Sequence, residues 1–118
     1  SNPVYQDTLG ALALASGKPA QAEGPLRKAI EGGDLPASHA ALACALAEQG
    51  KDAAAEAELA AISEALAGPR AHRDLDMCYW AGRAFAQLGM DDSADEVFSM
   101  ALESWPTHPW AAEMRGQQ

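Results

Sequence analysis

Large side chains are scarce in this chain of 118 residues. Aromatic residues make up only 6% of the sequence, and although 48% of the residues are hydrophobic, alanine supplies much of that share. A core made from such residues has few large anchors and depends on many close contacts between helices. Alanine also has the highest intrinsic helix propensity, so the composition favours helix along the whole chain.

Basic residues are also few, because 8 Lys and Arg stand against 17 Asp and Glu, and the formal net charge is −9. Nucleic-acid binding is driven by clustered Lys and Arg that neutralise phosphates, so this balance argues against a nucleic-acid partner. Anionic membrane surfaces are disfavoured for the same reason. The composition favours a protein or peptide partner that is apolar or basic.

Long apolar runs are missing as well. No stretch approaches the roughly 20 residues that a membrane-spanning helix needs, and the start does not resemble a signal peptide, so we expect no direct membrane insertion. The first residue is Ser1 and not Met, so we expect the start of the chain to be either a cloning remnant or the cut edge of something longer. The compartment stays open between cytoplasm and periplasm.

A helical pattern is present throughout, and it is clearest between Cys78 and Pro106. Two amphipathic segments meet at Gly89, and Pro106 closes the unit. Two helices that cross at close range need Gly or Ala at the crossing point and large side chains one turn away. The pattern supplies such residues at Ala81, Gly82, Phe85, Ala94, Phe98 and Ala101.

This spacing resembles the tetratricopeptide repeat (TPR), a helical hairpin that recurs about every 34 residues. The turn glycines Gly17 and Gly50 lie 33 residues apart, and Gly50 and Gly89 lie 39 apart. The repeats would cover about residues 3–36, 37–70 and 75–108 of a single domain spanning 1–118. The resemblance implies an all-α fold, a right-handed solenoid of three hairpins plus a terminal helix, because one hairpin cannot bury its apolar face alone.

Three stretches depart from a regular repeat. Pro25 is expected to kink or restart the second helix of the first unit. The excess spacing lies around residues 67–75, where Gly68 and Pro69 end one helix and Asp74 can cap the next, so a longer loop or an overlong helix is expected. Residues 109–116 repeat the Pro and Gly spacing of the chain's start, and they are either a capping helix or a partial fourth repeat.

The sequence assembles no catalytic or metal-binding motif. His39, His72 and His108 fall in different repeat junctions, so their convergence on one metal or nucleophile is not expected. Cys44 and Cys78 would be displaced by about 7 to 8 Å along neighbouring helices, so we expect unbridged thiols that are buried or line a groove. The chain is therefore expected to be no enzyme and to hold no cofactor or metal.

In the TPR family the first helix of each hairpin lines the concave side of the superhelix, where extended or helical peptides dock. The resemblance implies a shallow, largely apolar groove with polar and aromatic features mainly at one end. Tyr79 and Arg83 are of types enriched at binding hot spots, whereas the alanines of the same face can instead serve close helix packing. The predicted groove residues are Val4, Asp7, Ala11, Leu14, Ala40, Cys44, Ala47, Asp76, Tyr79 and Arg83.

The function that we expect is a non-catalytic interaction module, a scaffold segment of a larger bacterial-type assembly protein that binds a peptide or helix in this groove. A small secretion-type chaperone that wraps an apolar segment of an exported subunit is the alternative. Self-assembly into a homo-oligomer is a third interpretation, because Tyr5, Trp105 and Trp110 can present apolar surface at the two ends. Both tryptophans can also simply pack the final helix.

Overall fold

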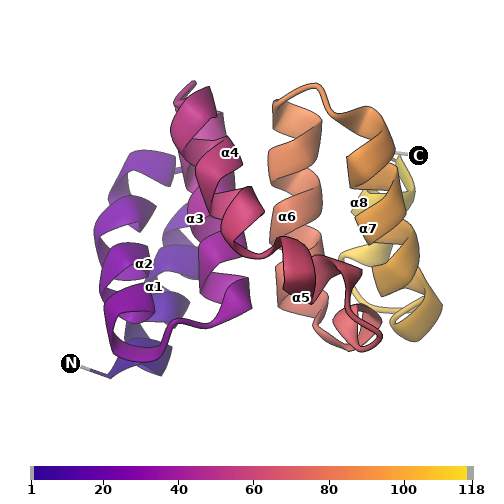
Figure 1. Cartoon of the computed structure of the whole chain (residues 1–118), viewed down its shortest axis with the longest axis horizontal. Helices are drawn as coiled ribbons and strands as arrows, with labels where there is room; N and C mark the ends of the chain where they lie inside the picture. The colour runs from indigo at the N-terminus through magenta and orange to yellow at the C-terminus, as the bar shows by residue number, and fades with distance from the viewer. Residues whose placement is uncertain (1, 117–118) are drawn as a thin grey trace.

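The computed structural model describes residues 2–116, and within that range it contains helices and no strand, which confirms the all-α prediction (Figure 1). None of the described helices combines the length and the apolar composition needed to cross a bilayer. The elements are α1 (Pro3–Ala15), α2 (Pro19–Gly33), α3 (Pro36–Glu48), α4 (Asp52–Ala61), α5 (Ser63–Ala67), the 3-10 helix η1 (Ala71–Arg73), α6 (Leu75–Gln87), α7 (Asp91–Ser104) and α8 (Ala111–Gly116).

Three helical hairpins follow one another along the chain: α1 with α2, α3 with α4, and α6 with α7. Each turns at a glycine with positive φ, namely 73° at Gly17, 78° at Gly50 and 78° at Gly89. Residues with a Cβ rarely adopt this conformation, so glycine is needed at each turn. The turns predicted from the glycine spacing are confirmed.

The helices of the first and third hairpins touch at a glycine. A Cβ added to Gly10 would lie 2.4 Å from Cγ of Leu26, and one added to Gly82 would lie 2.3 Å from Cε1 of Phe98. Leu26 and Phe98 are both fully buried. These contacts have the small-against-large arrangement that the sequence predicts for helices that cross at close range.

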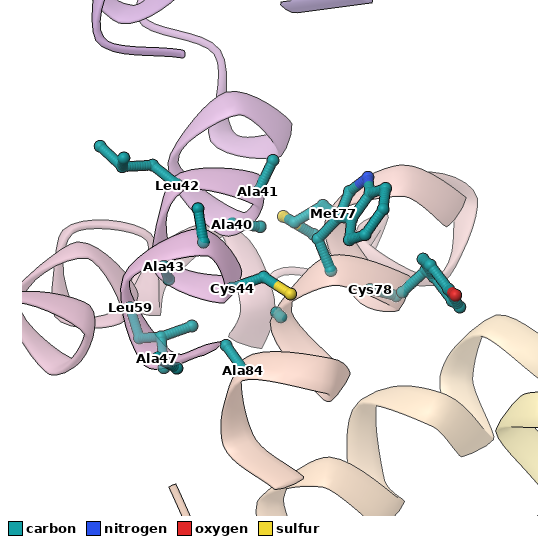
Figure 2. Packing of buried hydrophobic residues seen from close by; sticks show 14 of the residues in the cluster. Ala40, Ala41, Leu42, Ala43, Cys44, Ala47, Leu59, Met77, Cys78 and Ala84 are labelled. Atoms are coloured by element: carbon teal, nitrogen blue, oxygen red, sulfur yellow. The ribbon is translucent and has the colours of Figure 1, made fainter. Parts of the chain in front are cut away.

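Helix α3 is the centre of the fold. It packs against α2, α4 and α6, and residues 40–47 are buried without interruption. Small side chains let α6 approach closely, since Ala40 and Cys44 lie across from Met77 and Ala84 (Figure 2). Because α3 is rich in alanine, its packing relies on many short-range contacts of small side chains and not on a few large buried ones.

The junction between the second and third hairpins is irregular. Helix α6 packs mainly against α3 and α7, whereas α4 packs against α3 and leads into α5. The predicted helix stop at Gly68 is confirmed, because α5 ends at Ala67, and the longer connection that follows contains the 3-10 helix η1. The break at Ile62, which separates α5 from α4, was not predicted. Ile62 and Ala71 are buried and anchor this segment. Asp74 caps α6 by accepting a hydrogen bond from the Met77 amide, as predicted.

Helix α2 runs through Pro25 without interruption, so the predicted restart does not occur. Pro25 lies in the interior of the helix and supplies no amide donor there, while Ala22, Leu26 and Ala29 keep the apolar face of α2 buried. The helix ends at Asp34, whose φ of 45° is left-handed.

His39 joins the ends of three helices through two carboxylates. Its Nε2 lies 2.6 Å from Oδ1 of Asp34, and its Nδ1 lies 2.7 Å from Oε1 of Glu58. Burial lowers the pKa of His39, but the hydrogen bonds and charges of the two acids outweigh it, so that the pKa is raised above its ordinary value of 6.5. The imidazolium therefore links α3 to the end of α2 and to α4.

This link predicts a pH dependence of stability. A raised folded pKa gives stabilisation that is fully present below pH 6.5 and is lost as the pH rises through the folded pKa. We expect the free energy of unfolding, measured by urea denaturation, to fall across this window in the parent protein. His39→Gln should flatten that slope, and an equal slope in both proteins would contradict the assignment.

Candidate binding groove

The first helices of the three hairpins share one face, and part of it is open. A cavity of about 350 Å³ lies there between α1, α3, α6 and Trp110. We call it the open groove. Its lining residues are Asp7, Thr8, Ala11, Leu12, Ala15, Ala37, Asp76, Trp80 and Trp110.

Asp7, Ala11 and Asp76 are the predicted groove residues that the structure brings together in this cavity. Val4 lies on the same helix α1 with 65% of its surface exposed, but it does not line the cavity. Leu12 lines it and is 62% exposed, although it is not among the predicted groove residues. Its position one turn after Thr8 on the face of Ala11 and Ala15 was the signal that could have found it.

The prediction that Leu14, Ala40, Cys44, Ala47 and Tyr79 are exposed groove residues is wrong. All five are buried by residues of this chain. Ala40, Cys44 and Ala47 lie in the close contact of α3 with α6, and Leu14 belongs to the same core cluster. Ala40 and Ala47 therefore fit the alternative interpretation, in which the alanines of this face allow two helices to approach closely.

Tyr79 is covered by Trp110, which precedes α8. The two rings stack with centroids 3.9 Å apart and planes 12° from parallel, and Trp80 meets Trp110 edge to face at 5.8 Å. The Tyr79 hydroxyl donates a hydrogen bond to Glu113, and Ala111 and Met114 of α8 are buried. The sequence predicts the aromatic features of the groove at one end of the face formed by the first helices. In the structure, residues 110–114 cover that end.

Arg83 is engaged within the chain. Its Nη2 lies 2.8 Å from Oε2 of Glu48, which ties α6 to α3. The guanidinium carbon lies 5.7 Å from the ring centre of Tyr79 and 5.3 Å from that of Trp80, a distance at which cation–π attraction operates. Because 27% of the side chain is exposed, Arg83 can still contribute to a surface.

The open groove carries negative charge at one end. Partial desolvation raises the pKa of Asp76, the charges of Asp74 and Asp7 raise it further, and His108 opposes them only in part. Asp7 itself accepts a hydrogen bond of 2.8 Å from the Ser38 hydroxyl. Like charges raise a carboxyl pKa because each disfavours ionisation of the other, so a cation placed here would relieve the repulsion.

The two thiols are free and buried, in agreement with the prediction that they are unbridged. Burial raises the pKa of Cys44 above its usual range and that of Cys78 to about 12, and each thiol donates a hydrogen bond, Cys44 to Glu48 and Cys78 to the Ala71 carbonyl. A protonated, inaccessible thiol is a poor nucleophile. Among residues 2–116, no three His, Cys, Asp or Glu side chains gather in a geometry that could hold a metal ion.

The cover over Tyr79 predicts an unusual titration. Burial, followed by the hydrogen bond to Glu113, raises the pKa of Tyr79 to about 12. The stabilisation from keeping this phenol neutral is present below pH 10 and is lost as the pH rises toward 12. In a Tyr5→Phe background, where Tyr79 is the remaining one of the 2 tyrosines, ultraviolet absorbance should show ionisation near pH 12. A midpoint near 10 would show that the phenol is not covered.

The chain matches no protein-family model, no curated protein and no solved structure.

Proposed function

We propose that the chain is a protein-interaction module, a short solenoid of TPR-like hairpins, which binds a peptide or short helix of a partner protein in the open groove. The observation that carries this proposal is the apolar cavity of about 350 Å³ with Asp7 and Asp76 among its lining residues. Its volume falls within the range of about 300 to 1,000 Å³ in which proteins hold ligands. Three successive hairpins with glycine turns support the solenoid.

The groove selects a partner by two features. The exposed Leu12 side chain and the partly buried indole of Trp110 offer most of the apolar lining for one bulky side chain of the partner, while Trp80 also lines the groove but is only 3% exposed. Asp7 and Asp76 favour a Lys or Arg close to that side chain, in keeping with the net charge of −9. Since a cation binds best to ionised Asp76, affinity should increase as the pH rises through the raised pKa of this carboxyl.

The test is selection from a displayed library of random peptides, because it requires no known partner. We expect peptides with an apolar residue next to Lys or Arg to be enriched on the parent protein. Leu12→Glu and Asp76→Lys should each weaken binding of the selected peptides roughly tenfold or more, since a buried charge or a reversed charge opposes them.

Leu35→Glu is the matched control for Leu12→Glu. Leu35 is also an exposed leucine, but it does not line the open groove. Its substitution should leave peptide affinity unchanged. Enrichment of no peptide, or equal binding by the Leu12→Glu and Leu35→Glu variants, would overturn the proposal.

Self-association is a second candidate function, which a stripe on α1 favours. Val4, Tyr5 and Leu12 recur at helical spacing and are all more than half exposed. Sedimentation velocity at several concentrations should then show an oligomer that Tyr5→Glu dissociates. Tyr5 does not line the open groove, so the same variant should keep its peptide affinity. A monomer at every concentration would reject this candidate.

A further inference from the structure

A second apolar cleft opens between the second helices of the last two hairpins. It has a volume of about 410 Å³ and lies between α4 and α5 on one side and α6 and α7 on the other. The lining residues are Glu56, Leu59, Ala60, Ser63, Leu66, Ala67, Phe85, Met90, Ser93, Glu96, Val97 and Met100. It shares no lining residue with the open groove.

The cleft follows from the irregular junction. Helix α6 packs on α3 and α7, whereas α4 contacts α3 and α5. As a result, no helix covers the large side chains that lie between α4 and α7. Phe85, which the sequence pattern places inside a hairpin, is only partly buried, and Met90 is 39% exposed. Leu66 and Met100 are likewise partly buried. Apolar side chains gathered in one hollow in this way are typical of an interaction site.

We propose that this cleft is a docking site for the apolar face of a basic amphipathic helix of a partner protein. The acidic residues at the cleft supply the charge argument. Glu56 on α4 and Glu96 on α7 line it and are exposed, and Asp52 and Asp92 lie one turn before them on the same faces. No Lys or Arg belongs to the lining among the described residues. Lys or Arg flanking an apolar stripe would therefore meet carboxylates on both walls.

A helix fits this site better than an extended segment does. Residues 2–116 contain no strand, so the described part of the chain offers no sheet edge to which an extended peptide could add a strand. A helix satisfies its own backbone and presents apolar side chains at i, i+3, i+4 and i+7, which can enter a hollow walled by other helices. The cleft is large enough for a few such side chains, while the rest of the helix remains outside it.

The test uses a fluorescent synthetic peptide of Leu, Ala and Lys, with Leu at helical spacing on one face and Lys on the remainder. We expect fluorescence anisotropy to report saturable binding to the parent protein. A peptide with the same composition in scrambled order, and one with Glu in place of Lys, should each bind roughly tenfold more weakly or not at all.

Two variants of α4 with the same change of charge test whether the peptide binds in the cleft. Ala60→Arg places a long cation in the cleft at an exposed position, so the fold should persist, as circular dichroism can check, and affinity should fall roughly tenfold or more. Ala54→Arg is the control, since Ala54 is also exposed but lies on the other flank of α4, one turn before Glu58.

Three results would overturn the proposal. The first is equal weakening by Ala60→Arg and Ala54→Arg, which would mean general electrostatic attraction. The second is loss of binding in Leu12→Glu, which would place the peptide in the open groove. The third is self-association that Ala60→Arg abolishes, which would make a second copy of the chain the occupant. Failure of this proposal can be told apart from failure of the proposed function, because Ala60→Arg blocks the cleft and Leu12→Glu blocks the open groove.

Discussion

Replacing Gly82 by alanine should destabilise the protein, although a Gly→Ala change inside a helix ordinarily stabilises by about 0.5 to 1 kcal/mol. The added Cβ would lie 2.3 Å from Cε1 of Phe98, whose ring is fully buried and cannot move aside without displacing its neighbours. Overpacking of this kind costs about 1 to 3 kcal/mol. Urea denaturation should therefore give a lower free energy of unfolding for Gly82→Ala.

A compensating change provides the control. Phe98→Leu removes ring atoms from the position that the Cβ needs, so the double variant with Gly82→Ala should lose less free energy of unfolding than the two single losses combined. If Gly82→Ala is as stable as the parent protein, α6 and α7 are not in the close contact described above.

Trp110→Ala should release the segment that covers Tyr79. Truncation of a fully buried tryptophan costs about 3 to 5 kcal/mol, and Trp110 is only partly buried, so we expect a loss at or below the low end of this range. Hydrogen exchange should accelerate over α8, because the buried Ala111 and Met114 alone hold it less firmly. The pKa of Tyr79 should also fall from about 12 toward its ordinary value of 10.

Trp105→Ala is the matched control, because it removes the same side chain five positions earlier from a site that is 40% exposed. It should cost less than about 1 kcal/mol and leave both the exchange of α8 and the titration of Tyr79 unchanged. Equal effects of the two substitutions would contradict the role of Trp110 as the cover.

Local pattern was enough to predict the hairpins. Glycines at Gly17, Gly50 and Gly89 specify a left-handed turn that other residues rarely adopt, and Gly82 opposite Phe98 specifies a close helix contact. These features involve residues near one another in the sequence or within one hairpin. The pattern also predicted the cap at Asp74 because an N-cap needs only a side chain and an amide three residues later.

The exposed surface was harder to predict, because it depends on which helices meet across hairpins. The register identified the helix faces that carry Ala40, Cys44 and Ala47, but it could not show that α6 packs directly on them. The stacking of Trp110 on Tyr79 joins residues 31 positions apart, and no local signal specifies it. The same limit applies to Phe85, which the repeat pattern treats as an interior residue and the irregular junction leaves beside a cleft.

The claim that this chain binds partners through the open groove is tested most directly by methyl and indole nuclear magnetic resonance spectra of the parent protein with the strongest peptide from the library. We predict chemical-shift changes at the methyl groups of Ala11, Leu12 and Ala37 and at the indole of Trp80, with saturation at the binding constant measured in solution. Changes confined to residues outside this cavity, such as Leu59 and Met100, or no saturable change at all, would contradict the account.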